Sequence, residues 1–494
     1  MVEHGSSTMA QSHAEAFKLY KKAAYQGNMF AQCNVGTCFL YGHGVDNSDS
    51  EAARWFKLAA DQGYAMAQCN LGFLFAKGRG LPQNDVEAAR WYRRAADQGY
   101  ASAQSAMGSL YEEGCGVKQS DVESLRWVKK AAIQGDIAAQ CRLGFKFVAG
   151  RGVKRSQAEA VRWWRMAAEQ GDVQAQFELA TALEYGRGVE KSDKEAVQWY
   201  TKAAEQGNSL AQYSLGILYE SGRGAKQNDE EAVRWYRAAA EQNCSMAQVN
   251  LGIMYENGYG VKKSDEEAAR WYEKVADHGQ PGAQSSLGSM YKEGRGVAQS
   301  DAKAAQCYQK AADQGNAEAQ YNLGLFLQEG RCLKQSDSKA ARWLKKAADQ
   351  GHAMAQYRLG RLFNAGRGVA QSDSEAARWC QKAAEQGHAE AQSTLGEFFM
   401  FGCGVTKSDA KAAHWFKKAA DQGHFQAQRS IGALLKEGRG VAQSDEEAAY
   451  WFKRAADQQL ASIFLTRLLD DDELVVESLR NPADSARLPT QHDL

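Results

Sequence analysis

Residues 64–99 read YAMAQCNLGFLFAKGRGLPQNDVEAARWYRRAADQG, and the pattern of this stretch decides the fold. The same pattern returns every 36 residues, from the copy at 28–63 to the copy at 424–459, and no copy contains an insertion. A fixed period of this length is typical of stacked repeat arrays. A length of 494 residues would otherwise suggest about three globular domains. The period instead predicts twelve tandem repeats.

The register of the repeats is visible in the glycines and tryptophans. One position of the repeat, that of Trp91, holds tryptophan in every copy except one, in which Cys307 takes its place. Such regularity indicates that these positions serve the architecture of every repeat rather than one site. All but two of the 47 glycines fall in four columns, those of Gly72, Gly78, Gly80 and Gly99.

Each repeat reads as two helices joined by turns. In residues 64–77 the apolar positions recur with the spacing of one helical face. The turn at 78–80, Gly-Arg-Gly, ends this helix because glycine readily adopts the left-handed conformation that a helix C-terminus needs. Asn84, followed three residues later by Glu87, predicts a capping box at the start of a second helix, and Gly99 ends that helix.

A single helix pair cannot bury its apolar face, so the pairs must stack on their neighbours and share a continuous core. The sequence therefore predicts an all-α solenoid of helix–turn–helix repeats with half-repeat caps at both ends. The expected organisation is a disordered N-terminus at 1–11, an N-terminal capping helix at 12–27, the twelve repeats at 28–459, a C-terminal capping helix region at 460–481 and a flexible tail at 482–494.

The repeat contains the pattern A-x-x-x-L-G-x-x-Y-x-x-G-x-G-V followed by D-x-x-x-A-x-x-W-Y-x-x-A-A-x-x-G. This pattern resembles the Sel-one-like repeat (SLR) family, a relative of the tetratricopeptide repeats, and the resemblance covers residues 28–459. It implies a right-handed α-superhelix whose first helices line a concave surface. It also implies an adaptor function, since most proteins of the family act as adaptors.

The composition bears on partners and location. Lys plus Arg equals Asp plus Glu at 60 each, so no charge bias favours nucleic acid or an anionic membrane. No segment approaches the roughly 18 to 20 apolar residues that a membrane span requires, and residues 1–11 contain no apolar run typical of a signal peptide. We therefore expect a cytoplasmic protein that neither inserts into membranes nor binds nucleic acid.

The ten cysteines and the histidines do not form an evident metal or disulfide pattern. No paired cysteine spacing recurs within the repeats, which fits a reducing compartment. His352, His388 and His424 share one column directly after a turn glycine. A separation of one repeat is too large for three ligands to converge on one ion. We expect these histidines to be solvent-exposed turn residues, with a pH-sensitive contact strip as the alternative. We expect no metal and no cofactor.

Three functions remain open at this point. No Ser/His/Asp or Cys/His constellation stands out from the periodic background, which favours a non-enzymatic scaffold that binds a protein or peptide along its concave face. A regulatory subunit that positions a partner enzyme is an alternative that the sequence does not separate from the first. A hydrolase is a weaker alternative, implied by activity proposed for some cysteine-rich members of the resembled family.

The variable columns of the first helix predict where a partner binds. The columns of residues 66, 69, 73, 76 and 77 lie on one helix face, opposite the packed one. An interaction surface needs a run of apolar side chains, and acidic residues beside it favour a peptide with apolar anchors and some basic residues. The alternative is that these side chains fill a narrow superhelix. The predicted partner-binding residues are Phe73, Phe145, Phe177, Tyr213, Ile217, Ile253, Tyr321, Leu325 and Tyr357, with Glu112, Glu184, Glu220 and Glu256 along one edge.

Overall fold

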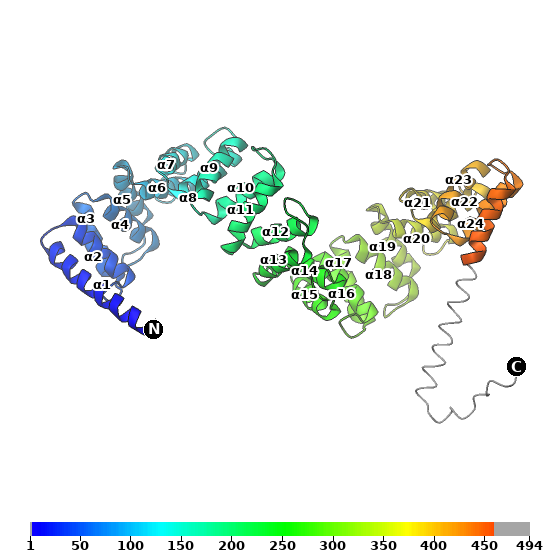
Figure 1. The fold of residues 1–494 in the computed structure, drawn as a ribbon, viewed down its shortest axis with the longest axis horizontal. Coiled ribbons are helices and arrows are strands. Elements are labelled where there is room, and N and C mark those ends of the chain that lie inside the picture. Colours follow the sequence, from blue (N-terminus) through cyan, green and yellow to red (C-terminus); the bar gives the residue numbers. More distant parts are fainter. Residues whose placement is uncertain (1, 459–494) are drawn as a thin grey trace, which may run out of the picture. The chain divides into compact units, whose positions relative to one another are not determined.

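The structure is a computed structural model, and it describes residues 2–458, with side chains from residue 12 onward. Every regular element in this range is an α-helix, and short turns link successive helices (Figure 1). The predicted all-α repeat fold is thus confirmed. The helices are α1 (Val2–Tyr25), α2 (Met29–Tyr41), α3 (Asp49–Asp61), α4 (Ala65–Lys77), α5 (Asp85–Asp97), α6 (Ala101–Glu113), α7 (Asp121–Ile133), α8 (Ile137–Ala149), α9 (Gln157–Glu169), α10 (Val173–Tyr185), α11 (Asp193–Glu205), α12 (Ser209–Ser221), α13 (Asp229–Glu241), α14 (Ser245–Asn257), α15 (Asp265–Asp277), α16 (Pro281–Glu293), α17 (Asp301–Asp313), α18 (Ala317–Glu329), α19 (Asp337–Asp349), α20 (Ala353–Ala365), α21 (Asp373–Glu385), α22 (Ala389–Phe401), α23 (Asp409–Asp421) and α24 (Phe425–Glu437), followed by helical residues 445–458.

The helices alternate between two roles. The even-numbered helices α2 to α24 are the first helices of the repeats, and the odd-numbered helices from α3, with residues 445–458, are the second helices. The chain divides into two compact units, residues 1–262 and 263–494, and the boundary falls between α14 and α15. No helix within residues 2–458 combines the length and apolar character that a membrane crossing requires.

The N-terminus differs from the prediction. Residues 2–11 of the segment expected to be disordered belong to α1, which begins at Val2 instead of Ser12. Residues 2–11 contain no proline and only one glycine, so little in their sequence stops a helix from extending in the N-terminal direction. The predicted C-terminal capping region and tail, residues 460–494, lie outside the described residues.

A glycine in the middle of most first helices sets how closely the two helices of a repeat approach. In the repeat with α4 and α5, a Cβ atom added to Gly72 would lie 3.0 Å from the ring of Tyr92. Glycine inside a helix is less favourable than alanine by about 1 kcal/mol. The close packing of the Tyr92 ring, which is buried, offsets this loss.

The second glycine of the Gly-x-Gly turn lies where the turn of one repeat packs against the preceding repeat. Gly80 has a φ of 66°, and a Cβ atom on it would overlap the backbone of Asp49 at the start of α3. Beside it Arg79 donates two hydrogen bonds to the Asp49 carboxylate, at 2.6 and 2.9 Å. The same Arg–Asp bridge joins Arg331 to Asp301, Arg367 to Asp337 and Arg439 to Asp409.

A buried glutamine in each first helix bonds to the helix before it, and in ten of the twelve repeats it also bonds to a glutamine after its own second helix, so that it links three helices. The Gln68 side chain, on α4, donates to the Ala60 carbonyl at the end of α3 over 3.1 Å. Its own oxygen accepts a hydrogen bond of 2.8 Å from Gln98, which follows α5. This glutamine ladder explains why an Ala-Gln pair recurs in every copy. The same Gln–Gln bond joins Gln62 to Gln32, Gln134 to Gln104, Gln170 to Gln140, Gln206 to Gln176, Gln242 to Gln212, Gln314 to Gln284, Gln350 to Gln320, Gln386 to Gln356 and Gln422 to Gln392.

Cys332 tests the role of the turn glycine, because it occupies the Gly80 column with a φ of 48°. The left-handed conformation disfavours a side chain by about 1 to 2 kcal/mol. The Cys332→Gly substitution should therefore raise the free energy of unfolding by about 1 kcal/mol, although the thiol's hydrogen bond to the Asp301 carbonyl is lost. Urea unfolding measures the change. The converse substitution at the matched position, Gly368→Cys, should destabilise by about 2 kcal/mol, and equal stability of both variants would contradict the prediction.

Candidate functional site

The predicted apolar site residues all lie on first helices, but their exposure differs. Phe73, Phe145 and Ile253 are exposed, each by 37 to 39% of its surface. Tyr321 is only 6% exposed and stacks on the His352 ring, with 4.8 Å between ring centroids. The alternative that these residues fill the structure therefore holds for Tyr321. The others are half-buried: Phe177, Tyr213, Ile217, Leu325 and Tyr357.

Further exposed apolar side chains extend this face of the first helices. They occupy the columns of residues 66 and 77, seven residues before and four after the column of Phe73, so the three columns form one stripe along each helix. We call the columns of residues 66, 73 and 77 the exposed stripe. The sequence prediction noted that these columns vary but singled out no apolar residue in the two outer ones. These additional residues are Phe30, Tyr41, Met66, Tyr185, Leu210, Met246, Met354 and Phe401.

The exposed stripe is apolar on the successive first helices α12 and α14. Leu210 is 45% exposed, Met246 46% and Ile253 39%. Neither the segment 210–217 nor the segment 246–253 contains a charged residue. Because these two helices belong to successive repeats of the same unit, their side chains form an apolar patch, which we call the α12–α14 patch.

The acidic edge is largely engaged within the chain. Glu184 is buried and accepts hydrogen bonds from the Tyr200 hydroxyl at 2.9 Å and from Arg223 at 2.5 Å. Glu220 is exposed and accepts a hydrogen bond of 2.5 Å from the Tyr236 hydroxyl. Glu256 lies at the corresponding position of α14. The edge is therefore less open to basic partner residues than the sequence predicted: a cation of the following repeat pairs with Glu184, whereas Glu220 accepts from a neutral hydroxyl.

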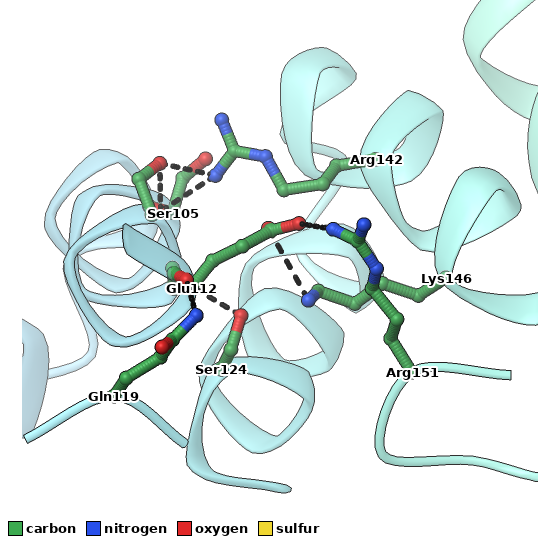
Figure 2. A network of polar contacts seen from close by, with 9 residues as sticks. Ser105, Glu112, Gln119, Ser124, Arg142, Lys146 and Arg151 are labelled. Atoms are coloured by element: carbon green, nitrogen blue, oxygen red, sulfur yellow. Dashed lines mark hydrogen bonds and ion pairs between the residues drawn. The ribbon is translucent and has the colours of Figure 1, made fainter. Parts of the chain in front are cut away.

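Glu112 belongs to a charged network between α6 and α8 (Figure 2). Its two carboxylate oxygens lie 3.2 Å from the Lys146 ammonium and 3.1 Å from the Arg151 guanidinium. Lys146 is only 1% exposed, and it stands in the column of Leu74, which is apolar in every other repeat. The sequence prediction missed Lys146, although this break in an apolar column was a readable signal.

The histidine column has a structural role that differs from the prediction. His352, His388 and His424 are half-buried N-caps of α20, α22 and α24, where each Nδ1 accepts a backbone N–H of the first turn. Other repeats use Asn or Asp for the same cap, as Asn208 does for α12. The prediction of solvent-exposed turn residues was wrong because the cap draws each imidazole toward the helix end and against its neighbours.

The most deeply buried cysteine thiols are poor nucleophiles. All ten are free. Burial raises the pKa of Cys33 to about 11 and the pKa values of Cys69 and Cys141 to about 12, which leaves almost no thiolate near neutral pH. Within residues 2–458 no group of three His, Cys, Asp or Glu side chains is placed to hold a metal ion.

The repeats identify the family. The sequence matches the Sel1 repeat in thirteen successive segments: residues 1–28, 30–64, 65–100, 101–136, 137–172, 173–208, 209–244, 245–280, 281–316, 317–352, 353–388, 389–424 and 425–460. The chain belongs to the Sel1 repeat family. The resemblance drawn from the sequence is thus confirmed. The additional Sel1 segment, residues 1–28, contains the half-repeat that the sequence predicted as an N-terminal cap.

Two solved structures resemble these Sel1 repeats. A protective antigen of uropathogenic Escherichia coli strains displaying an SLR fold is 34% identical, with a TM-score of 0.82 over 90% of this chain and 96% of the antigen chain. A Sel1 repeat protein from Oxalobacter formigenes is 32% identical, with a TM-score of 0.52 over 66% of this chain and 93% of its own. A search of curated proteins found no match.

The histidine caps predict that part of the Sel1 array loses stability in acid. Burial lowers the pKa values of His388 and His424 below the ordinary 6.5, although Glu390 acts in the opposite direction on both and Arg358 adds to the lowering at His388. Stability from these caps should be complete above about pH 6.5 and fall as the pH drops through the lowered pKa values, because the unfolded state then binds more protons. Hydrogen exchange of α22 and α24 at pH 7.5 and 5.5 measures this.

A double variant, His388→Asn with His424→Asn, provides the control for the acid effect. Asn caps α12 and α18 in this chain without a group that titrates in this range. The variant should keep the protection of α22 and α24 nearly equal at both pH values. If it loses protection at pH 5.5 as strongly as the unmodified protein, the histidines do not cause the acid sensitivity.

The buried ion pair of Glu112 and Lys146 predicts that substitutions of its two members change the stability of the protein unequally. Glu112→Gln should destabilise by about 3 kcal/mol, because it leaves a buried ammonium without its counter-charge. Lys146→Leu should be neutral or stabilising, since it restores the apolar residue that the other repeats carry in this column. Urea unfolding of both variants makes the comparison. An equal loss of stability in both would show that the pair itself holds the repeats together.

Proposed function

We propose that this Sel1 repeat protein is a non-enzymatic scaffold that binds a protein or peptide partner along the exposed stripe of its first helices. The observation that carries the proposal is the gathering of exposed apolar side chains in three columns of these helices, of which the α12–α14 patch is one example. Contiguous exposed apolar surface is typical of protein interaction sites. Glu220, exposed at the edge of this patch, favours a basic residue in the partner there.

The hydrolase alternative receives less support from the residues. A thiol nucleophile needs a lowered pKa and access to substrate, whereas burial raises the pKa values of Cys33, Cys69 and Cys141. A regulatory subunit remains a form of the same scaffold, with an enzyme as the bound partner. We also propose a cytoplasmic location, which the free cysteines favour, and a partner other than nucleic acid, as the balanced charge suggests.

The α12–α14 patch can be removed without disturbing the core. The triple variant Leu210→Ser, Met246→Ser and Ile253→Ser should weaken binding of a partner recovered by affinity purification at least about tenfold, because central apolar contacts often contribute more than 1 kcal/mol each. Binding is measured by titration calorimetry.

The matched control also changes three exposed apolar residues to serine, but these residues lie on second helices, outside the exposed stripe. The triple variant Val86→Ser, Val122→Ser and Ile133→Ser should bind the partner as the unmodified protein does. Both triple variants should melt close to the original temperature, since changes at exposed positions are usually small. Equal binding by the two variants would remove the α12–α14 patch from the proposal.

A further inference from the structure

The surface between α6 and α8 carries an excess of positive charge. Lys146 and Arg151 share a single carboxylate, that of Glu112, and a third cation, Arg142, also extends from α8 to α6. Figure 2 shows the Glu112 side chain extending toward Arg151 and Lys146, while the Arg142 guanidinium turns toward Ser105 on α6. Both oxygens of Glu112 are therefore engaged by the other two cations.

Arg142 is the cation left over. No ion pair joins Arg142 to a carboxylate within the part of the chain that the structure describes. The acid at the same position of the next first helix, Glu178, accepts a hydrogen bond of 2.8 Å from Gln174 instead, and burial raises its pKa. Glu113 is exposed at the end of α6, where its carboxylate accepts a hydrogen bond from the Cys115 thiol.

The Arg142 guanidinium is held in place before any ligand binds. Its Nη1 donates to the Ser105 carbonyl at 3.1 Å and to the Ser109 hydroxyl, both on α6. A guanidinium has five N–H donors in a planar fork that matches a carboxylate, so donors remain after these two bonds. Since Arg142 is only half-buried, they are within reach of solvent and of a partner.

An apolar contact lies beside this cation. Phe145 follows Arg142 by three residues on α8, so the two side chains share a helix face. Phe145 is exposed in part, while its ring makes an edge-to-face contact with Trp164, with 5.4 Å between centroids. On α6 the side chains nearest to this surface, Ser105 and Ser109, are short and leave both groups accessible.

We propose that the α6–α8 surface binds an Asp or Glu side chain of a protein partner through Arg142, while an adjacent apolar side chain of the partner packs on Phe145. The inference rests on the proposed scaffold function, and it specifies which partner side chains the α6–α8 surface binds. It differs from the basic partner residue favoured beside the α12–α14 patch, because the two surfaces carry charges of opposite sign. A phosphate of nucleic acid would also suit Arg142, but the chain has no net charge and Phe145 favours an apolar neighbour.

The experiment selects random 12-residue peptides displayed on phage against the full chain. The selected peptides should be enriched in Asp or Glu next to Leu, Ile or Phe. The Arg142→Gln variant should lose this enrichment, and a synthetic peptide of the selected sequence should bind it about tenfold or more weakly, as expected when a charge-assisted hydrogen bond is lost. Arg142→Lys, which keeps the charge but not the fork, should give an intermediate affinity.

Arg126→Gln is the matched control, because Arg126 is an exposed arginine on the second helix α7, 3.8 Å from Glu123. It should retain the acidic enrichment, and a thermal melt of each variant checks the fold. Enrichment of basic peptides, binding of single-stranded DNA that depends on Arg142, or acidic enrichment that survives Arg142→Gln would overturn the inference. Peptides that depend on Ile253 but not on Arg142 would leave the scaffold function standing, whereas no enrichment above background would overturn both.

Discussion

The glutamine ladder is the interaction on which the rest of the array depends. The Gln68 amide donates to a carbonyl at the end of the preceding repeat and accepts from Gln98 of its own repeat, so one side chain fixes three helices. Inside a protein such hydrogen bonds are strong, and an unmatched amide there is destabilising by about 1 to 3 kcal/mol. Because only eight residues separate Ala60 from Gln68, the turn between them has little freedom in length. This constraint gives a physical reason for the absence of insertions across twelve copies.

The same constraint divides each repeat into positions that pack and positions that are free. Gly72 and Gly80 bring helices and turns into contact at distances that a Cβ atom would prevent. Together with the buried alanines and the Gln column, they account for the packing within and between repeats. The columns of the exposed stripe take little part in it, so the side chains there vary without disturbing the stack. A repeat array built in this way can carry a different surface on each first helix, which is what a scaffold for an extended partner requires.

The sequence was sufficient for everything that depends on the period. It predicted the helices, the turns and the face that carries exposed apolar residues, because these follow from spacing within one repeat. It did not predict how exposed a given residue is, because that depends on a side chain in another repeat. Tyr321 and Phe145 both lie in variable columns, yet the ring of His352, 31 residues further on, covers Tyr321, while Phe145 stays exposed. The histidine caps and the pairing of Glu184 with Arg223 were missed for the same reason.

Packing alone does not explain why Lys146, a charged residue, occupies a buried position between α6 and α8. A buried ion pair rarely adds stability over apolar residues of similar size, and every other repeat holds an apolar residue in this column. Its consequence is electrostatic. Lys146 and Arg151 together hold the Glu112 carboxylate on α6, while Arg142 bonds to serines of the same helix. A carboxylate fixed in this way leaves the neighbouring guanidinium without an intramolecular counter-charge and still oriented by two serines. We infer that the buried lysine shapes the binding surface indirectly: it takes part in neutralising Glu112, so that Arg142 is the cation available to a partner.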